Sequence, residues 1–319
     1  MQNENILIDK LLAFDRKSIS RCISLAENDD TKVSYLIKNI AGSIGKAYRI
    51  GITGPPGAGK STITNQLTKL LRTQNYKVGI IAVDPTSPFT GGALLGDRVR
   101  MSDIGNDEGV FIRSMATRGS LGGLSKKAVD AADVLDAAGF DFIIMETVGV
   151  GQSELDIAQT TDTTIVVLVP ESGDAVQAMK AGLMEIADFF VLNKSDRPGA
   201  EQAVTSLKTI LMMREHSENS WMPNIIKSIA SEGKGIQDIW EEINRHKSFM
   251  IQSGQFLIKR QKQAKLRIKE IVEDKLKRKL WNSSIEKTLD ESLENVVLGN
   301  LSPYHIADAI IEKFKNHIH

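Results

Sequence analysis

The sequence predicts an α/β protein: a mostly parallel sheet covered by helices, with a helical lead-in before it and a helical arm after it. Between residues 47 and 246, short β-branched and apolar runs alternate with helical stretches, the pattern of a parallel sheet with helices on both faces. The informative polar residues stand where the predicted strands end, and such sheets bind ligands at the carboxyl ends of their strands. We therefore expect three parts, at residues 1–46, 47–246 and 247–319.

Composition argues against several classes of protein. The 319 residues include 40 Lys and Arg against 40 Asp and Glu, so no net charge attracts nucleic acid. The one cysteine, Cys22, excludes a disulfide framework and a cysteine-based zinc or iron–sulfur site. No apolar run approaches the roughly 20 residues of a membrane span. The first residues carry Glu4, Asp9 and Asp15 instead of the apolar stretch of a signal peptide. We expect a cytoplasmic protein that binds neither nucleic acid nor membrane.

Local patterns predict the individual elements. Apolar residues at helical spacing indicate helices in residues 1–46, broken at the cap-rich stretch 29–31. Strands are predicted at 48–53, 78–83, 110–115, 140–146, 163–169, 188–193 and 224–228. Helices are predicted at 60–73, 126–138, 153–160, 174–186, 199–213 and 235–246. A long helix is expected around residues 257–280, followed by shorter helices near 284–297 and 302–315.

A glycine-rich stretch after the first strand matches the phosphate-binding pattern G-x-x-x-x-G-K-[ST] in full. Its glycines let the backbone N–H groups point at phosphate oxygens, and the helix that follows adds its positive dipole end. Lys60 is expected to contact the β- and γ-phosphates of a nucleoside triphosphate and to act in catalysis, and the Ser61 hydroxyl to ligate Mg²⁺. The predicted nucleotide-binding residues of this loop are Gly54, Pro55, Pro56, Gly57, Ala58, Gly59, Lys60, Ser61 and Thr62.

Three acidic residues are candidates for the surroundings of the metal. Asp84 ends the second strand, and Asp97 lies in a long glycine-rich loop with Arg98 and Arg100, which could contact phosphates. Glu146 ends the apolar fourth strand, which is the Walker B arrangement that holds the Mg²⁺ shell. The alternatives are a turn or capping aspartate for the first residue and a solvated charged loop for the second.

A switch segment is predicted directly after the fourth strand. The backbone N–H of Gly149 can meet a γ-phosphate without a Cβ in the way, and hydrolysis would remove that contact. In Ras-type GTPases the next residue is a glutamine that orients the attacking water. Here Val150 occupies that position and Gln152 follows two residues later, so we expect slow intrinsic hydrolysis. Residues 118–124 and 171–182 are either responsive loops near the nucleotide or an ordinary turn and a capped helix start.

The base is predicted to be guanine. The sixth strand runs into Asn193, Lys194, Ser195 and Asp196, and the Asp196 carboxylate can accept hydrogen bonds from the guanine N1–H and exocyclic amine. Asn193 can serve the opposite edge of the base, and the stem of Lys194 can cover its plane. Adenine would leave the carboxylate without donors, which is costly.

The element after the seventh strand completes the predicted base site. It contains Ser228 and Ala230, and in GTPases a small residue of this element offers a backbone N–H to guanine O6. By itself this signal is weak.

The predicted long helix carries an apolar stripe and a basic surface. Residues 259–279 hold ten Lys and Arg against three acidic residues, without the interleaved aromatic residues that would stack on bases. We interpret this charge as a solvated helix face. Because such an arm cannot bury its apolar stripe alone, we expect it to form a dimer contact.

These motifs and their order resemble the MeaB/ArgK-type G proteins, whose vertebrate counterpart is the MMAA protein. The resemblance covers nearly the whole chain and is carried by residues 51–62, 82–87, 96–101, 118–124, 146–154 and 193–196. Glu146 is specific, since most GTPases carry Asp-Thr-x-Gly at that point. Ile229 departs from the Ser or Thr of many relatives, which concerns the side-chain part of the guanine contact.

The resemblance implies a GTPase chaperone that gates adenosylcobalamin loading of methylmalonyl-CoA mutase and protects that enzyme. It also implies a homodimer joined partly by the C-terminal helices, and a mobile segment at 171–182. It further implies GTP or GDP, with Mg²⁺ held by Ser61 near Asp84, Asp97 and Glu146. The alternatives are a chaperone of another cobalamin-dependent acyl-CoA mutase, a metallochaperone GTPase, which a single cysteine disfavours, or a kinase linked to amino-acid transport.

Overall fold

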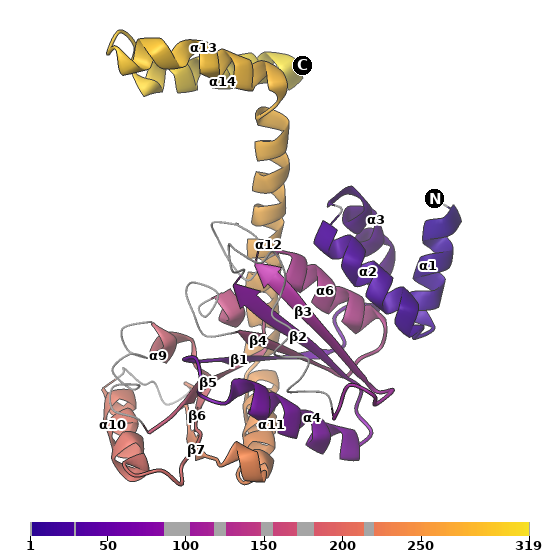
Figure 1. Ribbon diagram of the computed structural model, residues 1–319, viewed down its shortest axis with the longest axis vertical. Helices are drawn as coiled ribbons and strands as arrows, with labels where there is room; N and C mark the ends of the chain where they lie inside the picture. The colour runs from indigo at the N-terminus through magenta and orange to yellow at the C-terminus, as the bar shows by residue number, and fades with distance from the viewer. Residues whose placement is uncertain are drawn as a thin grey trace. The chain divides into compact units, whose positions relative to one another are not determined.

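The computed structural model, which describes residues 2–28, 30–85, 103–117, 126–147, 156–170, 182–213 and 220–318, centres on a seven-stranded parallel sheet (Figure 1). Its strands are β1 (Tyr48–Thr53), β2 (Val78–Pro85), β3 (Val110–Thr117), β4 (Phe142–Thr147), β5 (Thr163–Leu168), β6 (Phe189–Leu192) and β7 (Ile225–Lys227). Across the sheet the order is β3-β2-β4-β1-β5-β6-β7, and all neighbours are parallel. The predicted fold class is confirmed, and each predicted strand ends within two residues of its expected limits.

The register of the strands explains why polar residues collect at one edge of the sheet. β1 lies between β4 and β5, with Ile52 opposite both Glu146 and Ile165. Ala82 of β2 is also opposite Glu146. The segments that leave β1, β2 and β4 therefore start side by side at the carboxyl edge, where open α/β sheets bind ligands.

The chain divides into two compact units, the first ending at Arg260 and the second beginning at Gln261. Besides the lead-in, the described helices of the first unit are α4 (Lys60–Thr73), α6 (Lys126–Ala137), α9 (Leu183–Ile186), α10 (Ala200–Met212), α11 (Ile236–Gln252) and the start of α12 (Gln255–Leu280). A 3₁₀ turn, η2 (Ile157–Gln159), precedes β5. Among the described helices, none is both long and apolar enough to cross a bilayer.

Helices cover both faces of the sheet because successive strand residues point to opposite sides. Ile143 and Met145 of β4 pack in one apolar cluster with α6 and the lead-in helices. Ile144, between them, packs in another cluster with α4 and α11. A third cluster joins β5 and β6 to α9 and α10. Burial on both faces is what the apolar strands predict.

The lead-in is helical, as predicted, and consists of α1 (Gln2–Leu12), α2 (Arg16–Asn28) and α3 (Asp30–Ile40). The break between α2 and α3 lies where it was predicted, whereas the one between α1 and α2 was not predicted. Leu11, Ile19 and Ile23 are fully buried in the cluster that also contains α6. The Arg113 guanidinium of β3 pairs with Glu27 at the end of α2. These contacts make the lead-in part of the first unit.

The end of α11 differs from the prediction, which placed it at residue 246, whereas the helix continues to Gln252. His246 is buried, and its Nδ1 lies 2.8 Å from the Thr163 hydroxyl. Burial lowers the pKa of His246 more than the nearby Asp188 carboxylate raises it. His246 is thus tolerated at a buried position of α11 because its ring has a hydrogen-bond partner, Thr163, in β5.

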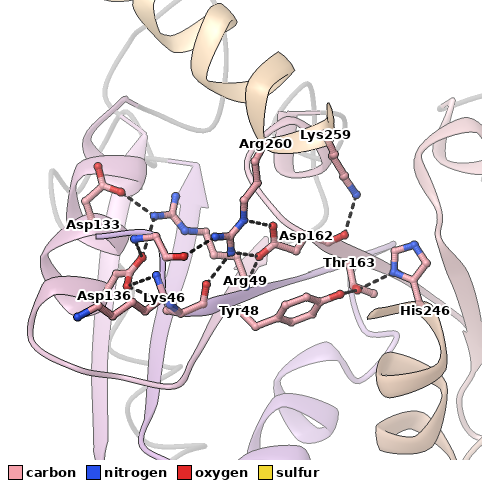
Figure 2. A network of polar contacts seen from close by, with 12 residues as sticks. Lys46, Tyr48, Arg49, Asp133, Asp136, Asp162, Thr163, His246, Lys259 and Arg260 are labelled. Carbon is pink, nitrogen blue, oxygen red and sulfur yellow. Dashed lines mark hydrogen bonds and ion pairs between the residues drawn. The ribbon is translucent and has the colours of Figure 1, made fainter. Parts of the chain in front are cut away.

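Polar contacts anchor the second turn of α12 at the amino edge of the sheet (Figure 2). Arg260 Nε and Nη2 donate to Asp162 Oδ1 and Oδ2 at 2.9 and 2.8 Å, directly before β5. The same guanidinium donates to the carbonyls of Gly45 and Ala47, just before β1. Lys259 Nζ donates to the Asp162 carbonyl at 2.9 Å. The part of α12 that belongs to the first unit is therefore held to the segments that lead into two central strands.

Two carboxylates of α6 bind the start of β1 (Figure 2). Asp136 accepts hydrogen bonds from the backbone N–H groups of residues 45–47 at 2.8 to 3.1 Å. Asp133 Oδ1 accepts from Arg49 Nη2 at 2.6 Å. Contacts with these two carboxylates thus fix the amino end of β1, and the glycine-rich loop follows its carboxyl end.

The second unit contains the rest of α12, together with α13 (Ser283–Val297) and α14 (Pro303–Ile318). The Asn282 side chain caps α13 by accepting from the Ser284 and Ile285 N–H groups at 3.0 and 3.1 Å. Lys313 Nζ of α14 donates to Thr288 Oγ1 of α13 at 2.7 Å. Most large apolar side chains described in this unit are exposed.

Candidate nucleotide-binding site

The predicted phosphate loop connects β1 to α4 at the carboxyl edge of the sheet. Gly54 has φ 134° and Gly59 has φ 90°, a region that side chains rarely adopt. A Cβ on Gly54 would lie 2.1 Å from the Val167 carbonyl oxygen, and one on Gly59 would lie 2.2 Å from Asn193 Nδ2. Both glycines are therefore required by backbone conformation and by close neighbours. This geometry lets a backbone approach a ligand closely.

The Lys60 side chain lies across the loop. Its Nζ donates to the Gly54 carbonyl at 2.7 Å and to the Pro55 carbonyl at 2.9 Å. The residue is buried at the first position of α4, so its cation stands at the helix start. A helix N-terminus and a held ammonium group together favour a bound anion.

Three side chains meet where α4 faces the end of β4. Ser61 Oγ donates to Glu146 Oε1 at 2.5 Å, and Thr64 Oγ1 donates to Glu146 Oε2 at 2.8 Å. Nearby, the hydroxyls of Thr53 and Thr147 lie 2.9 Å apart and link the ends of β1 and β4. The Walker B carboxylate thus lies beside the serine of the phosphate loop.

The oxygens at this point fit a magnesium ion. Mg²⁺ prefers oxygen ligands and is usually held by one or two protein groups together with substrate phosphates. Ser61 and Glu146 supply a hydroxyl and a carboxylate next to the loop that would hold those phosphates. No group of three or more His, Cys, Asp and Glu that could hold a metal is found in the described ranges.

Asn193, buried after β6, joins the phosphate loop to the predicted base loops. Its Nδ2 donates to the Ala58 carbonyl at 2.8 Å. Its Oδ1 accepts from the Ala230 N–H at 3.0 Å and from Ser228 Oγ at 3.1 Å. The sequence predicts contacts of Asn193 and Ala230 with guanine. In the structure the Ala230 N–H donates to the Asn193 side chain, so the contacts of both residues with a base stay predictions.

The loop after Asn193 presents the residues predicted to read the base. Lys194 adopts a left-handed backbone with φ 56°, and both the N–H and the hydroxyl of Ser195 donate to the Ser228 carbonyl at 3.1 Å. Asp196 is exposed, and Lys194 is half-buried. The turn is thus fixed by its backbone while the carboxylate remains accessible to a ligand.

Other predicted residues lie partly or wholly outside the described ranges. Asp84 lies at the end of β2, but only its backbone is described. Asp97, Gly149, Val150 and Gln152 lie outside the described residues, together with Arg98, Arg100 and residues 118–124 and 171–181. Of the phosphate loop, Ala58 is buried, whereas Pro56, Gly57 and Thr62 are exposed.

Two features of the site were missed by sequence reasoning. Thr64 contacts Glu146, and its place three residues after Ser61 on α4 is a signal that could have indicated it, because such residues share a helix face. The bridging of two loops by Asn193 could not be read from local sequence, since its partners are far away in the chain.

Comparisons with known proteins agree with this geometry. The profile of the family described as "Methylmalonyl Co-A mutase-associated GTPase MeaB" matches residues 19–284. A Pyrococcus horikoshii protein whose name assigns it to the GTPases is 48% identical, over 98% of this chain and 99% of its own. The mouse "methylmalonic aciduria type A homolog, mitochondrial" is 35% identical, over 84% of this chain and 66% of its own. A crystal structure of a protein named "LAO/AO transport system kinase" is 28% identical, with a TM-score of 0.74 over 98% of both chains.

Proposed function

This chain belongs to the MeaB family of GTPases, and we propose that its GTP cycle serves a cobalamin-dependent acyl-CoA mutase as client. As a member of that family it hydrolyses GTP to GDP and phosphate and uses Mg²⁺. The observation that carries the residue assignment is the contact of Ser61 with Glu146 at the head of α4. It brings the hydroxyl of the phosphate loop and the Walker B carboxylate together, as a nucleotide-bound metal requires.

The proposed catalytic roles follow from these positions. Lys60 binds the β- and γ-phosphates and stabilises the negative charge of the phosphoryl group as it is transferred. Its hydrogen bonds to the Gly54 and Pro55 carbonyls keep the ammonium group at the loop. Ser61 and Glu146, with Asp84 and Asp97, would hold the metal shell. When bound, Mg²⁺ neutralises charge that develops on the phosphates. The Gly149 N–H would contact the γ-phosphate.

The base assignment has its own test. We propose that Asp196 accepts from guanine N1–H and the exocyclic amine, with Lys194 over the base plane. Asn193, after β6, and Ser228 and Ala230, after β7, support it. A site of this kind rejects an analogue that lacks the donors by about 10⁴-fold or more. Calorimetry should therefore show GDP binding far above ADP binding. Asp196→Asn should shift the preference toward xanthosine diphosphate, and equal affinities of the wild type for GDP and ADP would contradict the assignment.

The proposed client is a methylmalonyl-CoA-type mutase. The family description names such an enzyme as the associated protein, which supports the proposal. Val150 replaces a water-orienting glutamine, so the isolated protein should turn over GTP slowly and a partner should accelerate it by ordering the switch segments. By linkage, nucleotide state must then change the mutase in return, which gates adenosylcobalamin loading and keeps damaged cofactor out.

The decisive experiment mixes the purified protein with its cognate mutase. GTP turnover should rise, and cofactor loading should differ between GTP and a non-hydrolysable analogue. If neither happens, the chaperone proposal fails and a GTPase of another client remains. A kinase, the class to which the related crystal structure is assigned by name, would instead move the γ-phosphate to an added acceptor. Labelled GTP distinguishes the two, because only a kinase leaves label on an acceptor.

We also propose a homodimer formed through a helical arm at residues 247–319. Ile268, Val272 and Leu276 follow one another at four-residue spacing on α12, and all three are exposed. Exposed apolar residues on one helix face mark an interaction surface. Val272→Glu should convert the dimer to a monomer in sedimentation, whereas Lys277→Glu, an exposed control on another face of the same helix, should not.

A further inference from the structure

Both oxygens of the Glu146 carboxylate are bound by hydroxyls of one helix. Ser61 Oγ donates to Oε1 and Thr64 Oγ1 donates to Oε2. Glu146 is 5% exposed and Thr64 is fully buried, so water does not substitute freely for the Thr64 contact. Ser61 and Thr64 stand three residues apart on α4 and therefore share a helix face.

Thr64 differs from a buried threonine that only fills space. A helical threonine can satisfy its hydroxyl on the carbonyl four residues earlier. Thr68, one turn further along α4 and equally buried, does this by donating to the Thr64 carbonyl at 2.7 Å. Thr64 directs its hydroxyl at the Glu146 carboxylate instead. The two threonines thus form a natural pair, one with a contact to the site and one without.

From these contacts we propose that Thr64 is a positioning residue of the magnesium site. A carboxylate can rotate about its last side-chain bond, because that torsion is broad. The Thr64 hydroxyl holds Oε2 on one side, so that Oε1 faces the Ser61 hydroxyl. The inference rests on the proposed function, in which Ser61 and Glu146 hold the metal shell. Partners that orient metal-binding carboxylates typically change metal affinity by about 10–100-fold when removed.

The test compares Thr64→Val, which keeps the shape and removes the hydroxyl, with Thr64→Ser, which keeps a hydroxyl. Thr68→Val is the matched control. For each variant, release of fluorescent GDP is measured across Mg²⁺ concentrations and in EDTA. We expect Thr64→Val to raise the half-saturating Mg²⁺ concentration about 10–100-fold, with GDP affinity in EDTA within about 2-fold of the wild type. Thr64→Ser and Thr68→Val should keep the wild-type magnesium dependence.

Further variants separate this inference from the proposed function. Glu146→Gln should itself lose the magnesium dependence, and adding Thr64→Val to it should change nothing more, because Thr64 acts through Glu146. If Glu146→Gln behaves like the wild type, the metal assignment fails. If Glu146→Gln loses the dependence but Thr64→Val does not, only the role of Thr64 is overturned. Equal shifts in Thr64→Val and Thr68→Val would also overturn it. Should Thr64→Val not fold, Thr64→Ala carries the same expectation.

Discussion

Removing Arg260 should destabilise the first unit strongly, although this residue lies far along the chain from every strand. Its guanidinium makes two hydrogen bonds to Asp162, whose side chain is 2% exposed, while that of Arg260 is 25% exposed. Removing one partner of a buried pair typically costs about 3–5 kcal/mol because a buried charge is left uncompensated. Asp162 would keep one hydrogen bond, from the Arg49 N–H at 2.8 Å. We therefore expect about 3 kcal/mol for Arg260→Ala.

The assay is urea unfolding followed by tryptophan fluorescence in a Trp281→Phe background, which leaves Trp221 and Trp240, both in the first unit. Lys69→Ala is the control, because Lys69 pairs with Asp103 on the surface, where both side chains are about half exposed. Such a pair contributes about 0.2–1 kcal/mol. Combining Arg260→Met with Asp162→Asn removes both charges and should recover part of the loss. The reasoning is refuted if Arg260→Ala costs no more than the control.

Three further predictions concern the first unit. Burial raises the pKa of Cys22 from 9.0 to about 11, so a thiol reagent at about pH 8 should modify the folded protein about 100-fold more slowly than the urea-unfolded protein. Burial holds the pKa of His246 below its ordinary 6.5, so the folded state binds fewer protons than the unfolded state. The urea concentration at the unfolding midpoint should therefore decrease as the pH is lowered from about 7 to about 5, and it should decrease less in His246→Gln. Gly54→Ala should cost about 3 kcal/mol or more in urea unfolding, because its Cβ meets the Val167 carbonyl. Gly57→Ala, with a positive φ but open space, should cost about 1–2 kcal/mol.

The fold could be predicted from local pattern because its strands and helices are strongly periodic. α4 spans residues 60–73 as expected, since a complete phosphate-loop pattern marks its start and an apolar face continues it. The order of strands could not be read in the same way. β4 separates β1 from β2, and no local residue signals that placement.

The candidate site was predictable where function requires a fixed spacing, as in residues 54–62 and 193–196. What sequence reasoning missed depends on contacts between distant segments. Asp162 and Arg260 are separated by 98 positions, and Thr64 meets Glu146 only because α4 packs against the end of β4. The end of α11 was also placed too early, at residue 246, because the alternation of strands and helices stops there, whereas the helix continues to Gln252.

The amide of Asn193 has a consequence for how this protein can change over evolutionary time. Among the described residues it bridges the proposed phosphate loop and the proposed base loop, and a methyl group on Gly59 would collide with it. We therefore expect a substitution near Ala230 that moves Asn193 to disturb the Ala58 carbonyl contact as well. Base selectivity and phosphate affinity are thus expected to be coupled in evolution. A change of nucleotide would need substitutions in both loops that contact Asn193.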